Sequence, residues 1–264
     1  MTPILMLGAG RMGGAILEGW DRAGAFDARD ILILDPNPSD AARRAQGRGA
    51  RLNPPDADLA AAQTVILAVK PQKWLEAAGQ YAAVLSPEAV IVSIAAGVPS
   101  QAIARAFGGR AVARAMPNTA AAINRGVTSL YADDPAARAR ARTLFEPLGT
   151  AVDLGDEALI HAATAISGSG PAYLYAFIEA LEAAGAGIGL PRADAERLAR
   201  ATAIGAAALL EATGEEPAEL RRQVTSPAGT TEAALNVLLG EHGLPSLLRE
   251  AAAAAQRRSK ELGG

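Results

Sequence analysis

The stretch Gly8-Ala9-Gly10-Arg11-Met12-Gly13 directly follows the apolar run Ile4–Leu7 and directly precedes a segment in which apolar residues recur at helical spacing. Three glycines at this spacing suit a turn from a strand into a helix. Gly8 permits the tight turn, Gly10 lets the backbone approach a pyrophosphate, and Gly13 lets the helix pack closely on the strand. Free N–H groups at the helix start can bind the phosphates. We therefore predict a nucleotide site with Gly8, Ala9, Gly10, Arg11, Met12 and Gly13 as contacts.

Outward from this turn, short apolar runs alternate with helix-length segments from Met1 to about Asp153. The runs lack the in/out alternation of a half-exposed sheet, which is typical of a parallel sheet covered on both faces by crossover helices. We predict an α/β fold with a Rossmann-like, doubly wound, mainly parallel sheet. The predicted strands are Ile4–Leu7, Ile31–Leu34, Thr64–Val69, Ala89–Ile94, Arg110–Ala115 and Val127–Tyr131.

After about Gly155 the strand-like runs disappear, and alanine-rich helical segments follow one another. This change predicts a dinucleotide-binding domain over residues 1–155 and an all-helical domain over residues 156–264. Pro171–Ala184 and Ala193–Ala212 carry apolar residues on more than one face, so we expect a homo-oligomer to cover them. Genome composition and the helix propensity of alanine are the alternative explanation.

The composition narrows the function further. Of 264 residues, 50% are hydrophobic and 20% charged, the net charge is −3, and cysteine is absent. A disordered chain, a basic nucleic-acid binder and thiolate chemistry are thereby disfavoured, and no cluster predicts a metal site. Neither a signal peptide nor an apolar run of membrane-spanning length is visible. We expect a cytoplasmic protein with a small-molecule substrate and without nucleic-acid or membrane partners.

The choice between NADH and NADPH depends on the end of the second predicted strand. Asp35 lies there, about 20 positions after Gly13, where an acidic residue binds the adenosine ribose of NAD. Asn37, Arg43 and Arg44 follow in the next loop and helix, where a 2′-phosphate could be bound. A simple turn role for Asp35 is an equal alternative. The sequence leaves the coenzyme as NADPH or NADH, with Asp35 and Asn37 as candidate contacts.

Two further loops lie at the carboxyl ends of predicted strands, where ligands of open α/β sheets bind. They are Ala68-Val69-Lys70-Pro71 and Ser93-Ile94-Ala95-Ala96-Gly97. Small residues there leave room for a coenzyme, although Lys70 could equally be a solvated charge. We predict coenzyme contacts at Ala68, Val69, Lys70, Pro71, Ala95 and Ala96.

Three later segments carry a family resemblance: Arg114-Ala115-Met116-Pro117-Asn118-Thr119, Ile166-Ser167-Gly168-Ser169-Gly170-Pro171-Ala172-Tyr173 and Val224-Thr225-Ser226-Pro227-Ala228-Gly229-Thr230-Thr231. In this order, over essentially the whole chain, the sequence resembles the pyrroline-5-carboxylate reductase family, which performs the last step of proline synthesis. The resemblance implies NAD(P)H-dependent reduction of 1-pyrroline-5-carboxylate to L-proline, a coenzyme contact at Asn118, and dimers or a decamer built of dimers. Ala120 and Ala228 depart from the usual proline and glycine of the family.

The last segment predicts the substrate site. The turn Ser226-Pro227-Ala228-Gly229 opens a helix near Thr230, so its N–H groups, two hydroxyls and the helix dipole can receive a carboxylate. We predict substrate contacts at Ser226, Gly229, Thr230 and Thr231. An ordinary helix N-cap by Thr230 is the alternative.

The resemblance adds two residues to this site. It implies that Glu157 contacts the substrate near its ring nitrogen. It also implies that Thr164 faces the substrate. Glu157, Thr164 and Thr231 are therefore the predicted catalytic residues. Neither His161 nor His242 fits a catalytic dyad.

Two alternative functions remain. A 3-hydroxyacid dehydrogenase-like oxidoreductase would use a lysine on a helix of the second domain, but the chain has only Lys70, Lys73 and Lys260. A non-catalytic nucleotide-binding protein is disfavoured by the intact segments Ser167–Tyr173 and Thr225–Thr231.

Overall fold

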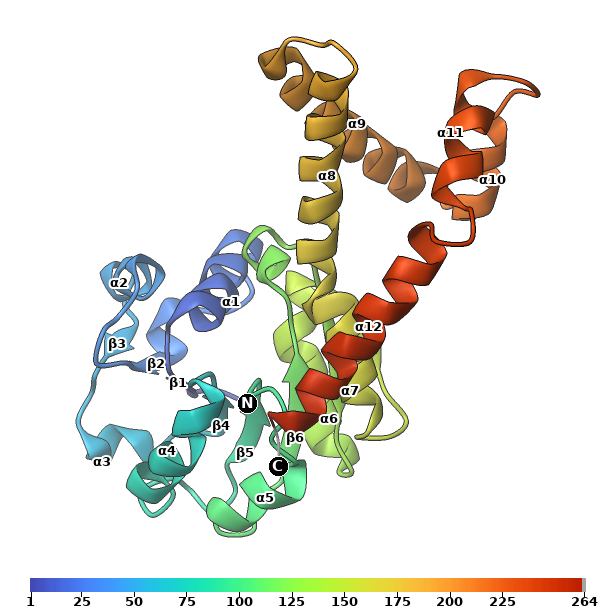
Figure 1. Ribbon diagram of the computed structural model, residues 1–264. Coiled ribbons are helices and arrows are strands. Elements are labelled where there is room, and N and C mark those ends of the chain that lie inside the picture. The colour runs from blue at the N-terminus through green and yellow to red at the C-terminus, as the bar shows by residue number, and fades with distance from the viewer. Residues whose placement is uncertain (263–264) are drawn as a thin grey trace. The chain divides into compact units, whose positions relative to one another are not determined.

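The computed structural model describes residues 1–262 and divides them into two compact units (Figure 1). One unit contains residues 1–169 together with the C-terminal segment from Ala254, and the other contains Gly170–Ala253. The predicted boundary between residues 155 and 156 separates a coenzyme-binding domain from a substrate-binding domain, and it stays a prediction. By contacts, residues 156–169 group with the sheet.

The first unit is built on one eight-stranded sheet with the order β3-β2-β1-β4-β5-β6-β7-β8. Strands β1 to β6 are parallel, β7 runs antiparallel to β6, and β8 pairs in parallel with β7. The strands are β1 Ile4–Leu7, β2 Ile31–Leu34, β3 Arg51–Leu52, β4 Thr64–Leu67, β5 Val90–Ser93, β6 Val112–Met116, β7 Gly126–Tyr131 and β8 Gly149–Asp153.

The sheet is buried on both faces, as the sequence predicts. Successive residues of a strand point to opposite faces. In β1, Ile4 and Met6 join one buried cluster with residues of α1, α2 and α6, whereas Leu5 and Leu7 join another with residues of α3, α4 and α5. The helices are α1 Arg11–Ala23, α2 Asp40–Gly47, α3 Asp56–Leu59, α4 Trp74–Tyr81, α5 Ser100–Ala106, α6 Pro135–Phe145 and α7 Leu159–Ala163.

All the predicted strands are present, and two further strands, β3 and β8, were not predicted. β3 has only two residues, too few to form an apolar run. β8 reads Gly-Thr-Ala-Val-Asp, and three of its five residues are exposed. Neither strand therefore carries the continuous apolar pattern by which the others were found.

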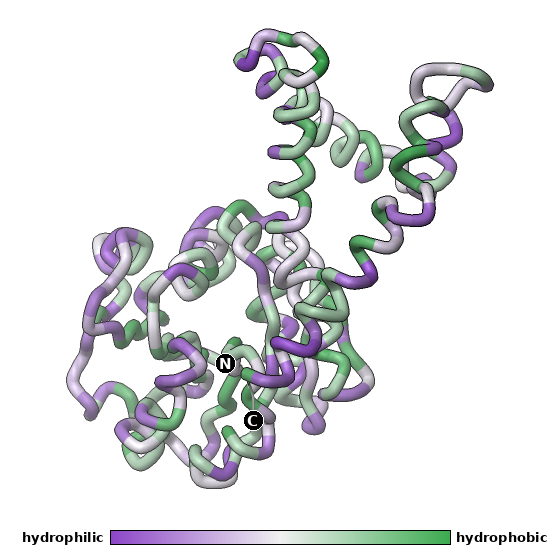
Figure 2. The backbone as a smooth tube through the Cα atoms, in the orientation of Figure 1, coloured by the Kyte–Doolittle hydropathy of each residue, from purple (hydrophilic) through white to green (hydrophobic). Residues whose placement is uncertain are grey.

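The second unit consists of helices only in the part of the chain that the structure describes. They are α8 Gly170–Gly187, α9 Arg192–Thr213, α10 Pro217–Gln223, α11 Thr230–Leu238 and the first part of α12 Leu244–Glu261. Apolar side chains on them remain uncovered, including Ile188, Ile204 and Val237, which are 85%, 70% and 76% exposed. Figure 2 shows hydrophobic positions along α8, none of whose described residues is buried. Within residues 1–262, no helix combines the length and apolar character needed to cross a membrane.

Candidate functional site

The glycine-rich turn between β1 and α1 gives each of its three glycines a different task. Gly8 has a φ of +92°, and a Cβ there would lie 2.8 Å from the carbonyl oxygen of Ala68. A Cβ on Gly13 would overlap the carbonyl oxygen of Gly8, so only glycine allows this close approach of helix and turn. A Cβ on Gly10 would meet no atom of the described residues within 4 Å. Gly10 therefore leaves open space at the start of α1, where the sequence predicts the phosphates.

A groove of about 640 Å³ opens beside this turn at the carboxyl ends of β1, β2 and β4. Its volume suits part of a dinucleotide. The predicted coenzyme contacts in its lining are Gly8, Gly10, Asp35, Ala68, Val69 and Lys70. The other predicted contacts are outside that lining: Ala9, Arg11, Met12, Gly13, Asn37, Pro71, Ala95, Ala96 and Asn118.

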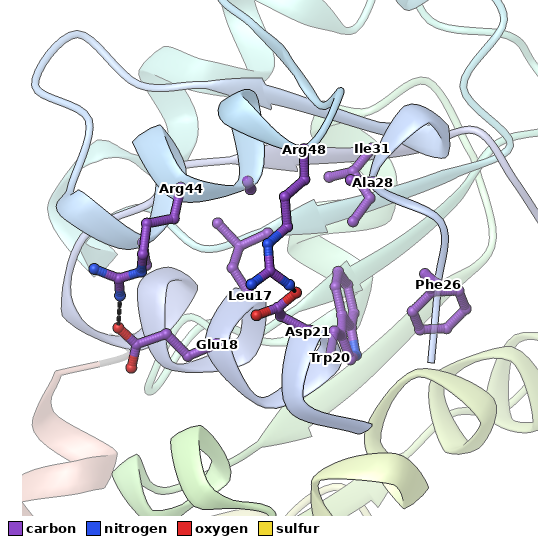
Figure 3. A pocket seen from close by; sticks show the side chains of 11 residues that line it. Leu17, Glu18, Trp20, Asp21, Phe26, Ala28, Ile31, Arg44 and Arg48 are labelled. Atoms are coloured by element: carbon purple, nitrogen blue, oxygen red, sulfur yellow. Dashed lines mark hydrogen bonds and ion pairs between the residues drawn. The ribbon is translucent and has the colours of Figure 1, made fainter. Parts of the chain in front are cut away.

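A second, much smaller pocket lies between α1 and α2 and has a volume of about 40 Å³ (Figure 3). Apolar residues such as Leu17 and Trp20 line it. Arg44 pairs with Glu18 over it, and Arg48 pairs with Asp21. It is too small for a nucleotide, and none of the predicted site residues lines it. The pocket shows that Arg44, a candidate for binding a 2′-phosphate, already pairs with Glu18 on α1.

Asp35 combines a turn role with a place in the groove. Its Oδ1 atom accepts a hydrogen bond from Asn37 N at 2.7 Å, which closes the turn, and its Oδ2 atom accepts one from Ala9 N at 2.6 Å. The carboxylate therefore ties the loop after β2 to the glycine-rich turn. Asn53, which the sequence analysis missed, also lines the groove and contacts the main chain of Asp35.

The loops after β5 and β6 lie further along the same edge of the sheet. Ala95 is buried and donates its N–H to Ser93 Oγ at 3.2 Å. The side chain of Asn118 is used within the protein, because its Nδ2 atom donates to Ser167 O at 3.0 Å and its Oδ1 atom accepts from Ala120 N at 3.2 Å. A coenzyme contact at Asn118 stays a prediction.

Glu157 is partly buried and lies in a polar cluster, with the buried residues Ser100 and Arg114, that joins three segments of the first unit. Its carboxylate accepts hydrogen bonds from Ser100 N at 2.6 Å, Ser100 Oγ at 2.8 Å and Arg114 Nη1 at 3.1 Å. The Arg114 side chain is only 3% exposed, and burial lowers its pKa, whereas the hydrogen bond to Glu157 opposes that shift. No sequence pattern connects Ser100 or Arg114 with Glu157. The predicted place of Glu157 beside the substrate stays a prediction.

Thr164 begins a π-helical stretch, Thr164–Gly168, that directly follows α7. Such widened turns occur often at functional sites. The Thr164 hydroxyl donates to Ile160 O at 2.7 Å, and the Ser167 hydroxyl donates to Ala163 O at 3.0 Å. Each hydroxyl keeps its oxygen as a possible acceptor. The predicted contact of Thr164 with the substrate remains untested.

In the second unit, the predicted substrate residues share one turn at the start of α11. Gly229, not Thr230, is the N-cap, and its N–H donates to Ser226 O at 3.0 Å. The alternative of an N-cap by Thr230 is therefore wrong. Ala228 N donates to Glu232 Oε2 at 2.7 Å, and Ala228 has a φ of +57°, a conformation that favours glycine.

Comparison with known proteins follows this division of the chain. The NADP oxidoreductase coenzyme F420-dependent family matches residues 3–97, and the pyrroline-5-carboxylate reductase dimerisation family matches residues 157–262. A pyrroline-5-carboxylate reductase from Pseudomonas aeruginosa is 41% identical over 267 residues, covering 99% of this chain and 97% of the relative. One from Escherichia coli is 35% identical, covering 97% and 96%. This chain belongs to the pyrroline-5-carboxylate reductase family.

Solved structures agree with this family and with the predicted fold. A pyrroline-5-carboxylate reductase from Coxiella burnetii superimposes with a TM-score of 0.90 at 31% identity, covering 100% of this chain and 99% of that one. The Plasmodium falciparum enzyme, solved with NADP bound, gives a TM-score of 0.85 at 23% identity, covering 100% and 98%. The predicted Rossmann-like sheet followed by helices is confirmed.

Gly10→Val should abolish coenzyme binding by the reductase, because the valine side chain would fill the open space beside the start of α1. The free energy of unfolding should change by no more than about 0.5 kcal/mol, since no described atom lies close to the new Cβ. Titration calorimetry and urea unfolding measure the two effects. Unchanged coenzyme affinity would place the phosphates elsewhere.

The C-terminal helix is tied to α7 by a histidine. His161 Nδ1 lies 3.0 Å from Ser259 Oγ on α12, and Ser259 is buried. Burial lowers the pKa of His161, and the positive charges of Arg114 and Lys260 lower it further, although Glu157 raises it. In the unfolded chain, a histidine has a pKa of about 6.5.

This difference predicts a loss of stability in acid. Below pH about 6.5 the unfolded chain takes up a proton that folded His161 resists, so the free energy of unfolding should fall until the pH reaches the lower folded pKa. His161→Asn should flatten this part of the stability profile in urea unfolding between about pH 5 and 8. His242→Asn, which removes an exposed histidine, is the matched control. Equal profiles for the wild type and His161→Asn would contradict the assignment.

Proposed function

We propose that this protein transfers a hydride from NADH or NADPH to the C=N carbon of 1-pyrroline-5-carboxylate and so produces L-proline. Full-length similarity to pyrroline-5-carboxylate reductases, at up to 41% identity among the relatives above, carries this assignment. The coenzyme supplies the hydride when it is bound. The substrate is a cyclic imine basic enough to arrive protonated, so the chain's own work is to bind, orient and exclude water.

The structure fits a dinucleotide at the glycine-rich turn. Gly8 and Gly13 allow the close contact of β1 with α1, and Gly10 leaves the space that a phosphate needs. We assign the adenosine half of the coenzyme to the groove at Asp35, and the loops with Ala68–Pro71, Ala95 and Ala96 to the rest of the coenzyme. In this assignment residues 1–155 are the coenzyme-binding part and residues 156–264 the substrate-binding part.

For the substrate carboxylate, we assign Ser226, Gly229, Thr230 and Thr231 at the start of α11. No side chain among residues 1–262 caps this helix at Gly229, so its first N–H groups and the Thr231 hydroxyl can serve an anion. Thr164 belongs to the first unit, and its contact with the substrate stays a separate prediction. We assign Glu157 a positioning role, because its carboxylate already holds Ser100 at the start of α5 and Arg114 on β6.

A homo-oligomer is supported by two observations. The helices of the second unit leave large apolar side chains exposed, and the matching family of residues 157–262 is a dimerisation family. A second copy of the chain would cover these helices and so reduce the apolar surface that is exposed to water. A decamer built of dimers, a cytoplasmic location and the lack of a nucleic-acid partner stay predictions.

The alternative dehydrogenase chemistry has less support. A 3-hydroxyisobutyrate dehydrogenase from Mycobacterium tuberculosis shares the fold, with a TM-score of 0.53 at 18% identity, covering 99% of this chain and 92% of that one. That similarity concerns the fold alone. The second unit contains no lysine in its sequence, because the lysines of the chain are Lys70, Lys73 and Lys260. Lys260 lies near the end of α12, in the part of that helix that groups with the first unit, so the segment Gly170–Ala253 offers no lysine for this chemistry.

A steady-state assay tests the proposed function directly. The purified protein should form proline from 1-pyrroline-5-carboxylate and oxidise one reduced coenzyme for each proline. Coenzyme oxidation is followed by absorbance, and proline is measured separately. If neither NADH nor NADPH supports proline formation, the assignment is wrong, and the result favours a nucleotide-binding protein without catalytic activity.

Thr231→Ala should weaken substrate use far more than coenzyme binding, because its hydroxyl lies at the start of α11 and the coenzyme contacts lie in the first unit. We expect kcat/KM for 1-pyrroline-5-carboxylate to fall roughly tenfold to a few hundredfold, matching about 1.5–3 kcal/mol for a hydrogen bond to a charged group. Saturation curves for substrate and coenzyme, measured separately, give the result. Thr213→Ala is the control, because the Thr213 hydroxyl donates to Leu209 O and accepts from Glu215 N at the end of α9, and it is not among the proposed site residues. A shift confined to the coenzyme curve would overturn the placement of the carboxylate.

A further inference from the structure

Asn53 completes the edge of the sheet next to the groove. It follows β3 directly with a φ of 49°, and its N–H donates to Ile33 O at 2.7 Å, which extends the pairing of β2 with β3. Its side chain then bonds both polar main-chain atoms of Asp35. Asp35 N donates to Asn53 Oδ1, and Asn53 Nδ2 donates to Asp35 O, each at 3.0 Å. The Asn53 side chain thus replaces the hydrogen bonds that the main chain of a longer β3 would make with Asp35.

Asp35 is consequently fixed at every polar group. Asn53 holds its main chain, Ala9 N bonds Oδ2 at 2.6 Å and Asn37 N bonds Oδ1 at 2.7 Å. A carboxylate offers about four acceptor positions, so roughly two remain for a ligand. Because Asp35 lines the groove beside Gly8 and Gly10, these positions lie where a dinucleotide places its adenosine ribose.

The groove around Asp35 is lined by two carboxylates and two lysines, and no arginine of residues 1–262 lines it. Asp35 has no ion-pair partner among residues 1–262, and Glu76 adds a second carboxylate to the groove. The cations of the lining are Lys70 and Lys73, and Lys73 Nζ already pairs with Glu76 at 2.6 Å. Arg43 is exposed and outside the lining, and Arg44 binds Glu18 (Figure 3). The arginines that could have bound a 2′-phosphate are therefore not in the groove.

We propose that Asn53 is a positioning residue for coenzyme selection and that this reductase prefers NADH. By fixing Asp35, Asn53 holds a carboxylate that accepts a hydrogen bond from the 2′-hydroxyl of NADH and repels the 2′-phosphate of NADPH, which carries about two negative charges. The proposal rests on the proposed function only in assigning the groove to a nicotinamide coenzyme.

Asn53→Gly isolates the side chain, because glycine adopts the same positive φ without strain. Titration calorimetry with each coenzyme, in the absence of substrate, measures affinity independently of turnover. We expect the wild-type protein to bind NADH at least about tenfold more tightly than NADPH, as for a close charge contact. In Asn53→Gly, the affinity for NADH should fall about fivefold or more and that for NADPH less than about twofold, because the carboxylate is no longer preorganised.

Asn124→Gly is the matched control. Asn124 also has a positive φ, of 58°, and its Nδ2 atom bonds the carbonyl oxygens of Gly19 and Pro147, each at 2.8 Å, away from the groove. Both variants should lose stability in urea unfolding, and only Asn53→Gly should change the NADH to NADPH ratio.

Two results would overturn the proposal: wild-type affinity for NADPH equal to or above that for NADH, or an equal fall for both coenzymes in Asn53→Gly. The second result would leave Asn53 with a purely structural role. Failure of the proposed function is distinguishable, because it would abolish proline formation in the assay and leave the calorimetric ratio unchanged.

Discussion

The close approach of α1 to the carboxyl end of β1 is the constraint on which the rest of the coenzyme site depends. It requires glycine at two positions, since a Cβ on Gly13 would overlap the carbonyl oxygen of Gly8 and one on Gly8 would press on Ala68. The far end of α1 is fixed in a similar way, because Gly19 lies against Ala121 and Trp20 Nε1 donates to Leu144 O at 2.8 Å. A helix held at both ends keeps its first N–H groups at the groove, where they can act on an anion without reorganisation.

The sequence predicts those parts of the fold and the site that depend on residues close together in the chain. Buried strands have continuous apolar runs and the glycine-rich turn has a fixed spacing, so both are visible without knowledge of distant residues. β3 and β8 were missed because β3 has only two residues and β8 is largely exposed, so neither carries a continuous apolar run. The grouping of the end of α12 with the first unit depends on contacts between distant residues, such as that of Ser259 with His161, and so has no local signal in the sequence.

The polar clusters that the sequence analysis missed all join residues far apart in the chain. Ser100 and Glu157 are 57 positions apart, and Asn53 and Asp35 are 18 apart. Arg114 is buried and Glu157 is partly buried, whereas Asn53 is exposed, and in each case a sequence pattern does not say which residues are the hydrogen-bond partners. For this reason the sequence predicts only ligand or turn roles for Glu157 and Asp35. In the structure, Glu157 holds α5 to β6, and Asp35 holds the glycine-rich turn, so each shapes the site through other residues.

Ala228 shows how much of the substrate loop is imposed by its surroundings. The position has a φ of +57°, which costs an alanine about 1–2 kcal/mol relative to a right-handed conformation. The loop keeps this conformation although the usual glycine is absent, because Ala228 N is bound by Glu232 and Gly229 N by Ser226 O. A backbone that stays in a costly conformation must be held by its hydrogen bonds, and here they fix the direction of the first N–H groups of α11. The departure of this chain from the family pattern therefore changes the stability of the loop and leaves its polar groups in place.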